Sequence, residues 1–196
     1  MPRLIVPVLL AFALIVGARA YGQPISYFAF MDGPSEAPPN ASPGTGFAQL
    51  DIDTTAHTMR VRASFQDLIG TTTAAHVHTP TATPGVGTAS VATQVPSFSG
   101  FPLGVTSGNM DTTFDTSQAS TWNPSYITAN GGTPLGAEAA FAQQLSEGRA
   151  YFNIHSTQFP GGEIRGFLAI PEPGSAALLG TAGILALAQR RRRRGA

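Results

Sequence analysis

The sequence has no cysteine and no lysine, and only 11% of its 196 residues are charged. Without cysteine, the chain has no disulfide framework, no thiolate zinc site and no cysteine nucleophile. Its stability must then come from the burial of apolar surface and from the pairing of strands.

Positive charge is scarce in the middle of the chain. All eleven basic residues are arginines and seven of them lie near the ends, which leaves residues 21–170 with four arginines against ten acidic residues, a formal charge of 4 − 10 = −6. Binding to nucleic acid needs a basic face that neutralises phosphates. We therefore expect no nucleic-acid partner.

Glycine and proline are plentiful, with 22 and 16 residues respectively. This composition is typical of a turn-rich β protein, and residues 21–170 are enough for one domain with its own core. Alternating polar and apolar residues, bounded by turn residues, predict strands. We expect them at residues 25–31, 47–53, 58–68, 74–79, 87–95, 100–105, 110–114, 150–155 and 163–168.

One short helix is predicted at residues 135–147. Thr133 suits the N-cap and Pro134 the first turn, while Gly148 suits the end of the helix. The stretch Trp122-Asn123-Pro124 predicts only a turn.

Residues 1–20 have the pattern of a secretory signal helix. Arg3 precedes an apolar run, and Ala18-Arg19-Ala20 fits a cleavage site that would leave Tyr21 as the first mature residue. The alternative is a membrane anchor, for which the apolar run is short.

The C-terminal residues 171–196 change character. Pro171-Glu172-Pro173 precedes sixteen mostly apolar residues, 174–189, and the cluster Arg190, Arg191, Arg192, Arg193 and Arg194. As a helix, the apolar run would be about 24 Å long, against a hydrocarbon core of ~30 Å, so it would span the inner membrane only with local thinning and snorkelling arginines. The alternative is a basic tail that binds acidic polymers.

The stretch RAYFNIHSTQFPGGEIRG, residues 149–166, predicts a hairpin. Alternation places Phe152 and Ile154 on one face, and Tyr151, Asn153 and His155 on the other. The turn is assigned to Pro160, Gly161 and Gly162, and the second strand carries Glu163 and Arg165 on one face, where the two can pair.

His76, His78 and His155 are the candidate metal ligands. The first two lie two residues apart, so they share a strand face, and the third comes from another strand. Three imidazoles can bind copper or zinc. The alternative is structural, with the histidines hydrogen-bonded to Glu163, Arg165 or the backbone. The H-x-H pair is also similar to that of copper-zinc superoxide dismutase, but only His57 remains to complete such a site.

Two family resemblances follow from these motifs. Residues 171–194, with Pro171-Glu172-Pro173 ahead of an apolar run and an arginine cluster, resemble a PEP-CTERM sorting signal. The resemblance implies processing by an exosortase, with cleavage near the Pro-Glu-Pro motif. It also implies delivery to the cell surface or the exopolysaccharide matrix of a Gram-negative bacterium.

Residues 25–169 resemble the CHRD domain, named from chordin. The matching blocks are Ser35-Glu36-Ala37-Pro38-Pro39, Thr45-Gly46, residues 74–78, residues 150–155 and residues 160–166. Thr79, where glycine is common, and the insertion-like segment 96–135 depart from the pattern. The resemblance implies a mainly β fold, an antiparallel Greek-key sandwich or barrel.

The sequence contains no nucleophile elbow, phosphate loop or dinucleotide fingerprint. We therefore predict a non-enzymatic, exported β module at residues 21–170, a structural or binding component of the surface or matrix with polysaccharide or matrix-protein partners. The alternative is a copper- or zinc-binding envelope protein, with a redox-related role, that uses the three histidines.

Overall fold

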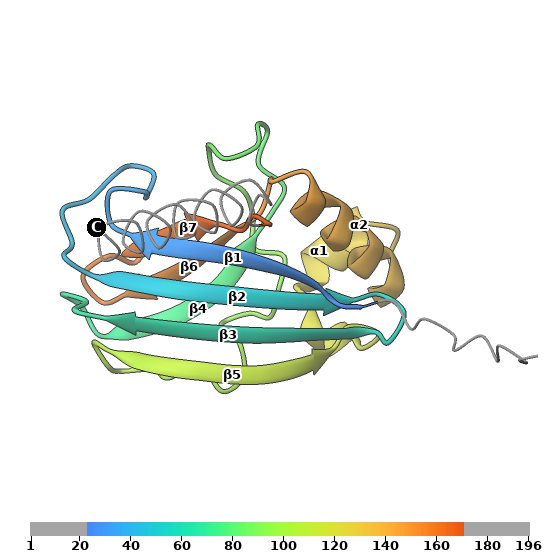
Figure 1. Ribbon diagram of the computed structural model, residues 1–196, viewed down its shortest axis with the longest axis horizontal. Coiled ribbons are helices and arrows are strands. Elements are labelled where there is room, and N and C mark those ends of the chain that lie inside the picture. Colours follow the sequence, from blue (N-terminus) through green and yellow to red (C-terminus); the bar gives the residue numbers. More distant parts are fainter. Residues whose placement is uncertain (1–22, 171–196) are drawn as a thin grey trace, which may run out of the picture.

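Seven antiparallel strands form one sheet in the computed structural model, which describes residues 23–170 (Figure 1). The order of the strands across the sheet is β4-β6-β7-β1-β2-β3-β5. Their bounds are β1 (Ile25–Asp32), β2 (Thr45–Asp53), β3 (Thr58–Gln66), β4 (Thr72–His78), β5 (Gly108–Asp115), β6 (Tyr151–Ser156) and β7 (Ile164–Phe167). The predicted mainly β, antiparallel class is confirmed.

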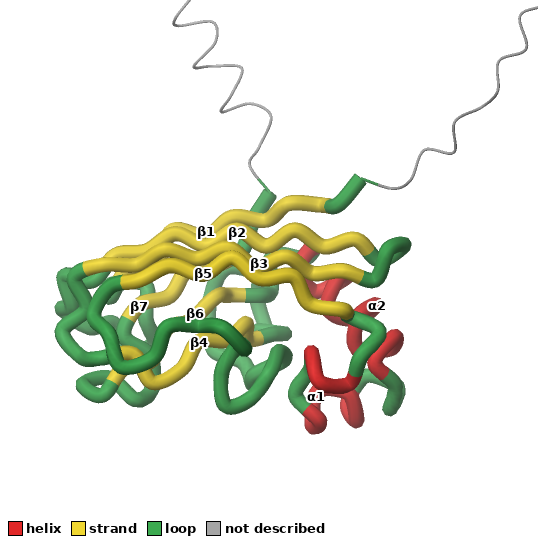
Figure 2. The backbone as a smooth tube through the Cα atoms, turned by 90° about the horizontal axis from the view of Figure 1, so that it is seen from below, coloured by secondary structure: helices red, strands yellow, loops and turns green. Residues whose placement is uncertain are grey.

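The sheet curls until its two halves face each other, as the layers of a sandwich do. Figure 2 shows β1, β2, β3 and β5 in one layer, and β6 and β4 below them. Within residues 23–170, the end strands β4 and β5 are not paired with each other, so the sheet stays a half-barrel and does not close into the barrel offered as an alternative from the sequence.

Side chains from the long connection between β4 and β5, residues 79–107, fill the gap between the two halves. Phe98 packs against Phe114 of β5, with ring centroids 5.4 Å apart, and against Phe152 of β6, at 5.8 Å. The burial of these rings and of the inward residues of every strand makes one continuous core. The core therefore holds β4 and β6 against the opposite half of the sheet.

The same connection covers the free edge of β4. Main-chain N–H groups of Ala92 and Phe98 donate to the carbonyls of Val77 and Ala75, and that of Thr72 donates to the carbonyl of Val105. The strands predicted at residues 87–95 and 100–105 are wrong, because these residues form only isolated bridges and loops. Gly100, Pro102 and Gly104 interrupt a regular ladder in the second of these segments.

Two α-helices lie at one end of the sheet, so the prediction of a single helix is wrong. Helix α2 (Pro134–Ser146) matches the predicted one, and the Thr133 hydroxyl caps it by accepting from the Gly136 N–H. Helix α1 (Pro124–Ala129) replaces the predicted turn, because the Asn123 side chain caps it by accepting from the Ser125 N–H. A 3-10 turn (Ala119–Thr121) precedes it.

Within residues 23–170, no helix has both the length and the apolar composition that crossing a bilayer requires. The predicted signal helix and the predicted C-terminal hydrophobic helix lie outside the described residues.

The buried carboxylate of Glu163 ties three loops together. Its oxygens accept from the Ser42 hydroxyl at 2.7 Å and from the N–H groups of Ile69 and Gly70 at 2.5 and 3.2 Å. The expected pairing with Arg165 is not found in the structure, since Arg165 binds Glu36 instead. Glu163 therefore fixes the loops next to the ends of β4 and β6.

Glu163→Gln is expected to lower the free energy of unfolding by about 1–3 kcal/mol, because one carboxylate acceptor becomes a donor that faces other donors. Urea unfolding of this variant and of Glu147→Gln, a surface control with a 35% exposed side chain, measures the effect. We expect the control to be nearly unchanged. Equal losses in both variants would contradict the role assigned to Glu163.

Candidate metal centre

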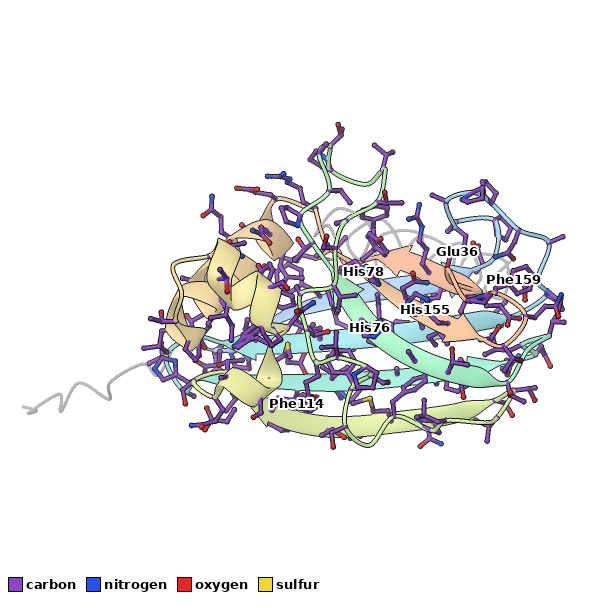
Figure 3. All side chains as sticks on the ribbon, turned by 180° about the vertical axis from the view of Figure 1, so that it is seen from behind. Glu36, His76, His78, Phe114, His155 and Phe159 are labelled. Carbon is purple, nitrogen blue, oxygen red and sulfur yellow. The ribbon has the colours of Figure 1, made fainter. Side chains whose placement is uncertain are left out.

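Antiparallel pairing of β4 with β6 brings the three candidate metal ligands together. His76 lies opposite Asn153, His78 opposite Tyr151, and His155 opposite Ala74. The residues between them, Ala75 and Val77 on β4 and Phe152 and Ile154 on β6, point into the core. The histidines therefore share the outer face of the sheet (Figure 3).

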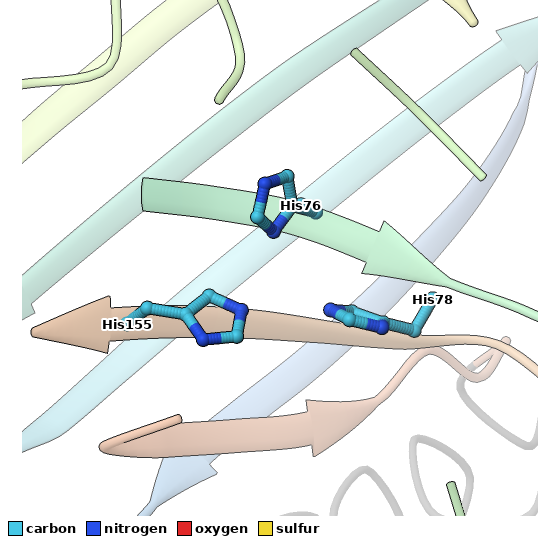
Figure 4. A group of neighbouring side chains, drawn as sticks. All are labelled: His76, His78 and His155. Carbon is cyan, nitrogen blue, oxygen red and sulfur yellow. The ribbon is translucent and has the colours of Figure 1, made fainter. Parts of the chain in front are cut away.

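The three rings surround one point (Figure 4). The centroid of the His76 ring lies 5.6 Å from that of His78 and 5.1 Å from that of His155, and the last two are 5.7 Å apart. Each ring offers one nitrogen, and the three nitrogens lie within 4.8 Å of one another. The structure thus brings the three candidate ligands together, which the sequence had left open.

In each ring, one nitrogen is hydrogen-bonded to a main-chain carbonyl. The pairs are His76 Nε2 with Pro96 (2.5 Å), His78 Nδ1 with Ala89 (2.9 Å) and His155 Nδ1 with Pro160 (2.9 Å). A carbonyl only accepts, so the bonded nitrogen carries the proton and the other nitrogen of a neutral ring keeps a lone pair. The structural alternative had named Glu163, Arg165 or the backbone as partners of the histidines. The observed partners are backbone groups, and neither Glu163 nor Arg165 is among them.

The second nitrogen of each ring is buried and has no hydrogen-bond partner. These atoms are His76 Nδ1, His78 Nε2 and His155 Nε2. A buried polar atom without a partner costs about 1–3 kcal/mol of stability. Three such atoms in one cluster need a physical reason, and a shared metal ion would satisfy all of them at once.

Burial keeps the imidazoles uncharged. It lowers the pKa of His76 and of His78 to about 4, and it also lowers the pKa of His155. The proximity of the rings acts in the same direction on His76 and His78, since protonation of one opposes protonation of the next. Neutral imidazole is the form that binds metals, so the rings are ready to bind at neutral pH.

Ala89 and Pro96 belong to the connection between β4 and β5, and side chains of this connection bind it to β4. The Thr93 hydroxyl accepts from the N–H of Val77, and the Ser97 hydroxyl accepts from the N–H of Ala75, each at 3.0 Å. The predicted turn at residues 160–162 carries the third carbonyl, that of Pro160. The tautomer of each ring is thereby set by the backbone.

A polar cluster that the sequence did not predict lies beside the histidines. The Arg165 guanidinium lies over the Tyr151 ring, 4.8 Å from its centroid, and this ring stacks on His78 with centroids 4.9 Å apart. Glu36 accepts from Asn153 Nδ2 at 2.6 Å and lies 3.8 Å from Arg165 Nε. The one signal for Glu36 was its place in the Ser35–Pro39 block of the family resemblance.

The donor set fits a small transition-metal ion. Nitrogen–metal distances of ~2.0–2.1 Å imply ligand nitrogens about 3.3–3.6 Å apart in a tetrahedral or trigonal site. The three nitrogens, within 4.8 Å of one another, would have to close in by about 1 Å or less at each ring. Side-chain rotation is enough for such a movement.

The comparison with protein families finds one family that covers most of the described residues. Residues 27–168, more than two thirds of the chain, match the family model of the CHRD domain. No curated protein and no solved structure matches the chain.

Glu36 gives the domain a distinctive pH dependence. Burial raises its pKa from 4.5 to about 6, against the opposing effects of Asn153 and Arg165. Its contribution to stability is therefore complete below pH 4.5 and is lost as the pH rises through 6, a difference of about 2 kcal/mol. As the pH rises from 4 to 7, the free energy of unfolding of the wild type is expected to fall by about 2 kcal/mol relative to that of Glu36→Gln.

Urea unfolding of both proteins across this pH range, with a chelator present, measures the difference. Every other titrating group is shared by the two proteins and cancels. Parallel stability curves would show that the environment of Glu36 does not penalise its charge.

Proposed function

The chain belongs to the CHRD domain family, and we propose that it is an exported, non-enzymatic β domain that binds one copper or zinc ion through His76, His78 and His155. The observation that carries this proposal is the meeting of three buried, partnerless ring nitrogens on one face of the sheet. When bound, the ion would supply a cross-link between β4 and β6, besides a Lewis-acidic charge.

The carboxylates of Glu36 and Glu163 support binding over catalysis. The carboxylate of Glu36 is held by Asn153 and Arg165, and that of Glu163 by Ser42 and two backbone N–H groups. A general base must be free to accept a proton within reach of the reacting group. Neither carboxylate is free in this way, so we assign the centre the role of holding a metal ion. The ion would serve the structure or, as in the alternative drawn from the sequence, a redox-related role.

Sorting to the cell surface is the second part of the proposal. The signal at residues 1–20 would direct export, and residues 171–196 would anchor the chain in the inner membrane until an exosortase-type enzyme processes it near Pro171-Glu172-Pro173. Both segments lie outside the described residues. The pairing of Ala169 with Phe28 brings the end of the described chain to the side of β1.

An aromatic surface on β1 and β2 favours a further role in the matrix. Phe30 is 81% exposed and packs beside Phe47, with ring centroids 5.3 Å apart, and Phe28 lies 6.1 Å from Phe47. A hollow of about 330 Å³ next to them is also lined by Thr45, Ser64 and Gln66. Aromatic and polar groups in this arrangement suit an exopolysaccharide or a matrix protein.

Metal titration of the full chain tests the binding role. One ion per chain is expected for the wild type. His78→Ala should weaken binding by more than about 100-fold, since even substitutions outside the ligand shell cost ~10–100-fold. The bound ion should also raise the melting temperature of the wild type but not that of His78→Ala.

His57→Asn is the matched control, because His57 binds Glu138 on another part of the molecule and its positive φ of 53° suits asparagine. This variant should keep the stoichiometry and affinity of the wild type. Absence of metal uptake by the wild type, or equal losses in the two variants, would refute the binding role.

Deletion of residues 171–196 tests the sorting role separately. The shortened chain should still be exported, but it should lose the association with the inner membrane and the cell surface that the full chain has. Fractionation and immunoblotting of both chains measure the distribution. Identical distributions would refute sorting by the C-terminal segment without affecting the metal centre.

A further inference from the structure

The charge of the donor set distinguishes between the ions that the histidines can hold. All three donors are neutral imidazoles, and the cluster of ligand atoms found in residues 23–170 includes no carboxylate. Because the chain has no cysteine, a thiolate does not supply negative charge either. A divalent ion bound here would keep its whole double charge in a buried site, where charge is costly.

The ionisable groups nearest along the outer face do not compensate that charge. Arg165 and Glu36 are bound to each other, and Arg165 also donates to the carbonyls of Ser35 and Gly87. The guanidinium, not the carboxylate, lies over the Tyr151 ring that stacks on His78. This pair is close to neutral as a unit and presents its positive member to the histidines.

A water molecule or hydroxide normally completes a zinc site that has three protein ligands, and hydroxide supplies the missing negative charge. Here the three free nitrogens are shielded from solvent. His76 and His78 are themselves only 7% and 8% exposed. The site therefore favours an ion that needs no fourth ligand and carries less charge.

We infer that the three-histidine centre is selective for a monovalent ion, Cu(I), over Zn(II), because its donors are three neutral nitrogens in a buried site without an anionic partner. This inference rests on the proposed metal-binding function and names its ion. Cu(I) is stable with two or three nitrogen ligands, and imidazole is a suitable donor for copper. No electron transfer is required for binding, and Ag(I) serves as a redox-inert analogue.

The chain offers a position at which the missing charge can be added. Ala74 lies opposite His155 in the sheet and two residues before His76, on the same outer face. Directly opposed side chains are close enough to interact across strands. Ala74→Asp would place a carboxylate beside the ligands, and Ala74→Asn is a control of the same shape without the charge.

Competition titrations of the full chain with Cu(I), Ag(I) and Zn(II), under anaerobic reducing conditions for Cu(I), test the inference. In the wild type, an equimolar mixture should load Cu(I) or Ag(I) and leave Zn(II) free. Relative to Ala74→Asn, Ala74→Asp should shift the ratio of dissociation constants toward Zn(II) by about tenfold or more, as the attraction between charges a few ångströms apart implies.

The possible outcomes separate the inference from the function on which it rests. Zn(II) that binds the wild type as tightly as Cu(I) or Ag(I) would overturn the selectivity but leave the metal site intact. An unchanged ratio in Ala74→Asp would show that charge does not set the selectivity. No uptake of any of the three ions by the wild type would overturn both proposals.

Discussion

The pairing of β4 with β6 is the constraint on which the rest of this side of the molecule depends. Its register places Ala75 and Val77, with Phe152 and Ile154, in the core, and this places the histidines on the opposite face. A slip of one residue would exchange the two faces and put imidazoles into the core. The hydrophobic effect that stabilises the sheet therefore also determines where the candidate ligands lie.

The fold also requires that the free edge of β4 be covered. The connection between β4 and β5 covers this edge, and it also forms part of the histidine site. The segment that runs along this edge satisfies the N–H and C=O groups of the strand. It also presents the carbonyls of Ala89 and Pro96 to the rings of His78 and His76. The outer face of β4 and β6 is buried for this reason, and burial is what keeps the imidazoles neutral.

Local patterns predicted the elements whose signals lie within a few residues. The hairpin of β6 and β7 has a proline-glycine turn, and α2 has a capping threonine, a proline and a closing glycine. The covering segment was mistaken for strands because short apolar runs look alike in strands and loops. Helix α1 was mistaken for a turn because six residues are too few to show a helical period.

The sequence by itself determined that the domain is built mainly of strands and, for the strand at residues 150–155, which side faces the core, because alternation is a local property of the chain. The antiparallel arrangement was implied by the family resemblance. Only the tertiary structure decided that His155 meets His76 and His78, and that Glu36 meets Arg165 in place of Glu163. These partners lie on segments far apart in the sequence. Which segments become neighbours depends on how the whole sheet is ordered and curled, and no single stretch of residues contains that information.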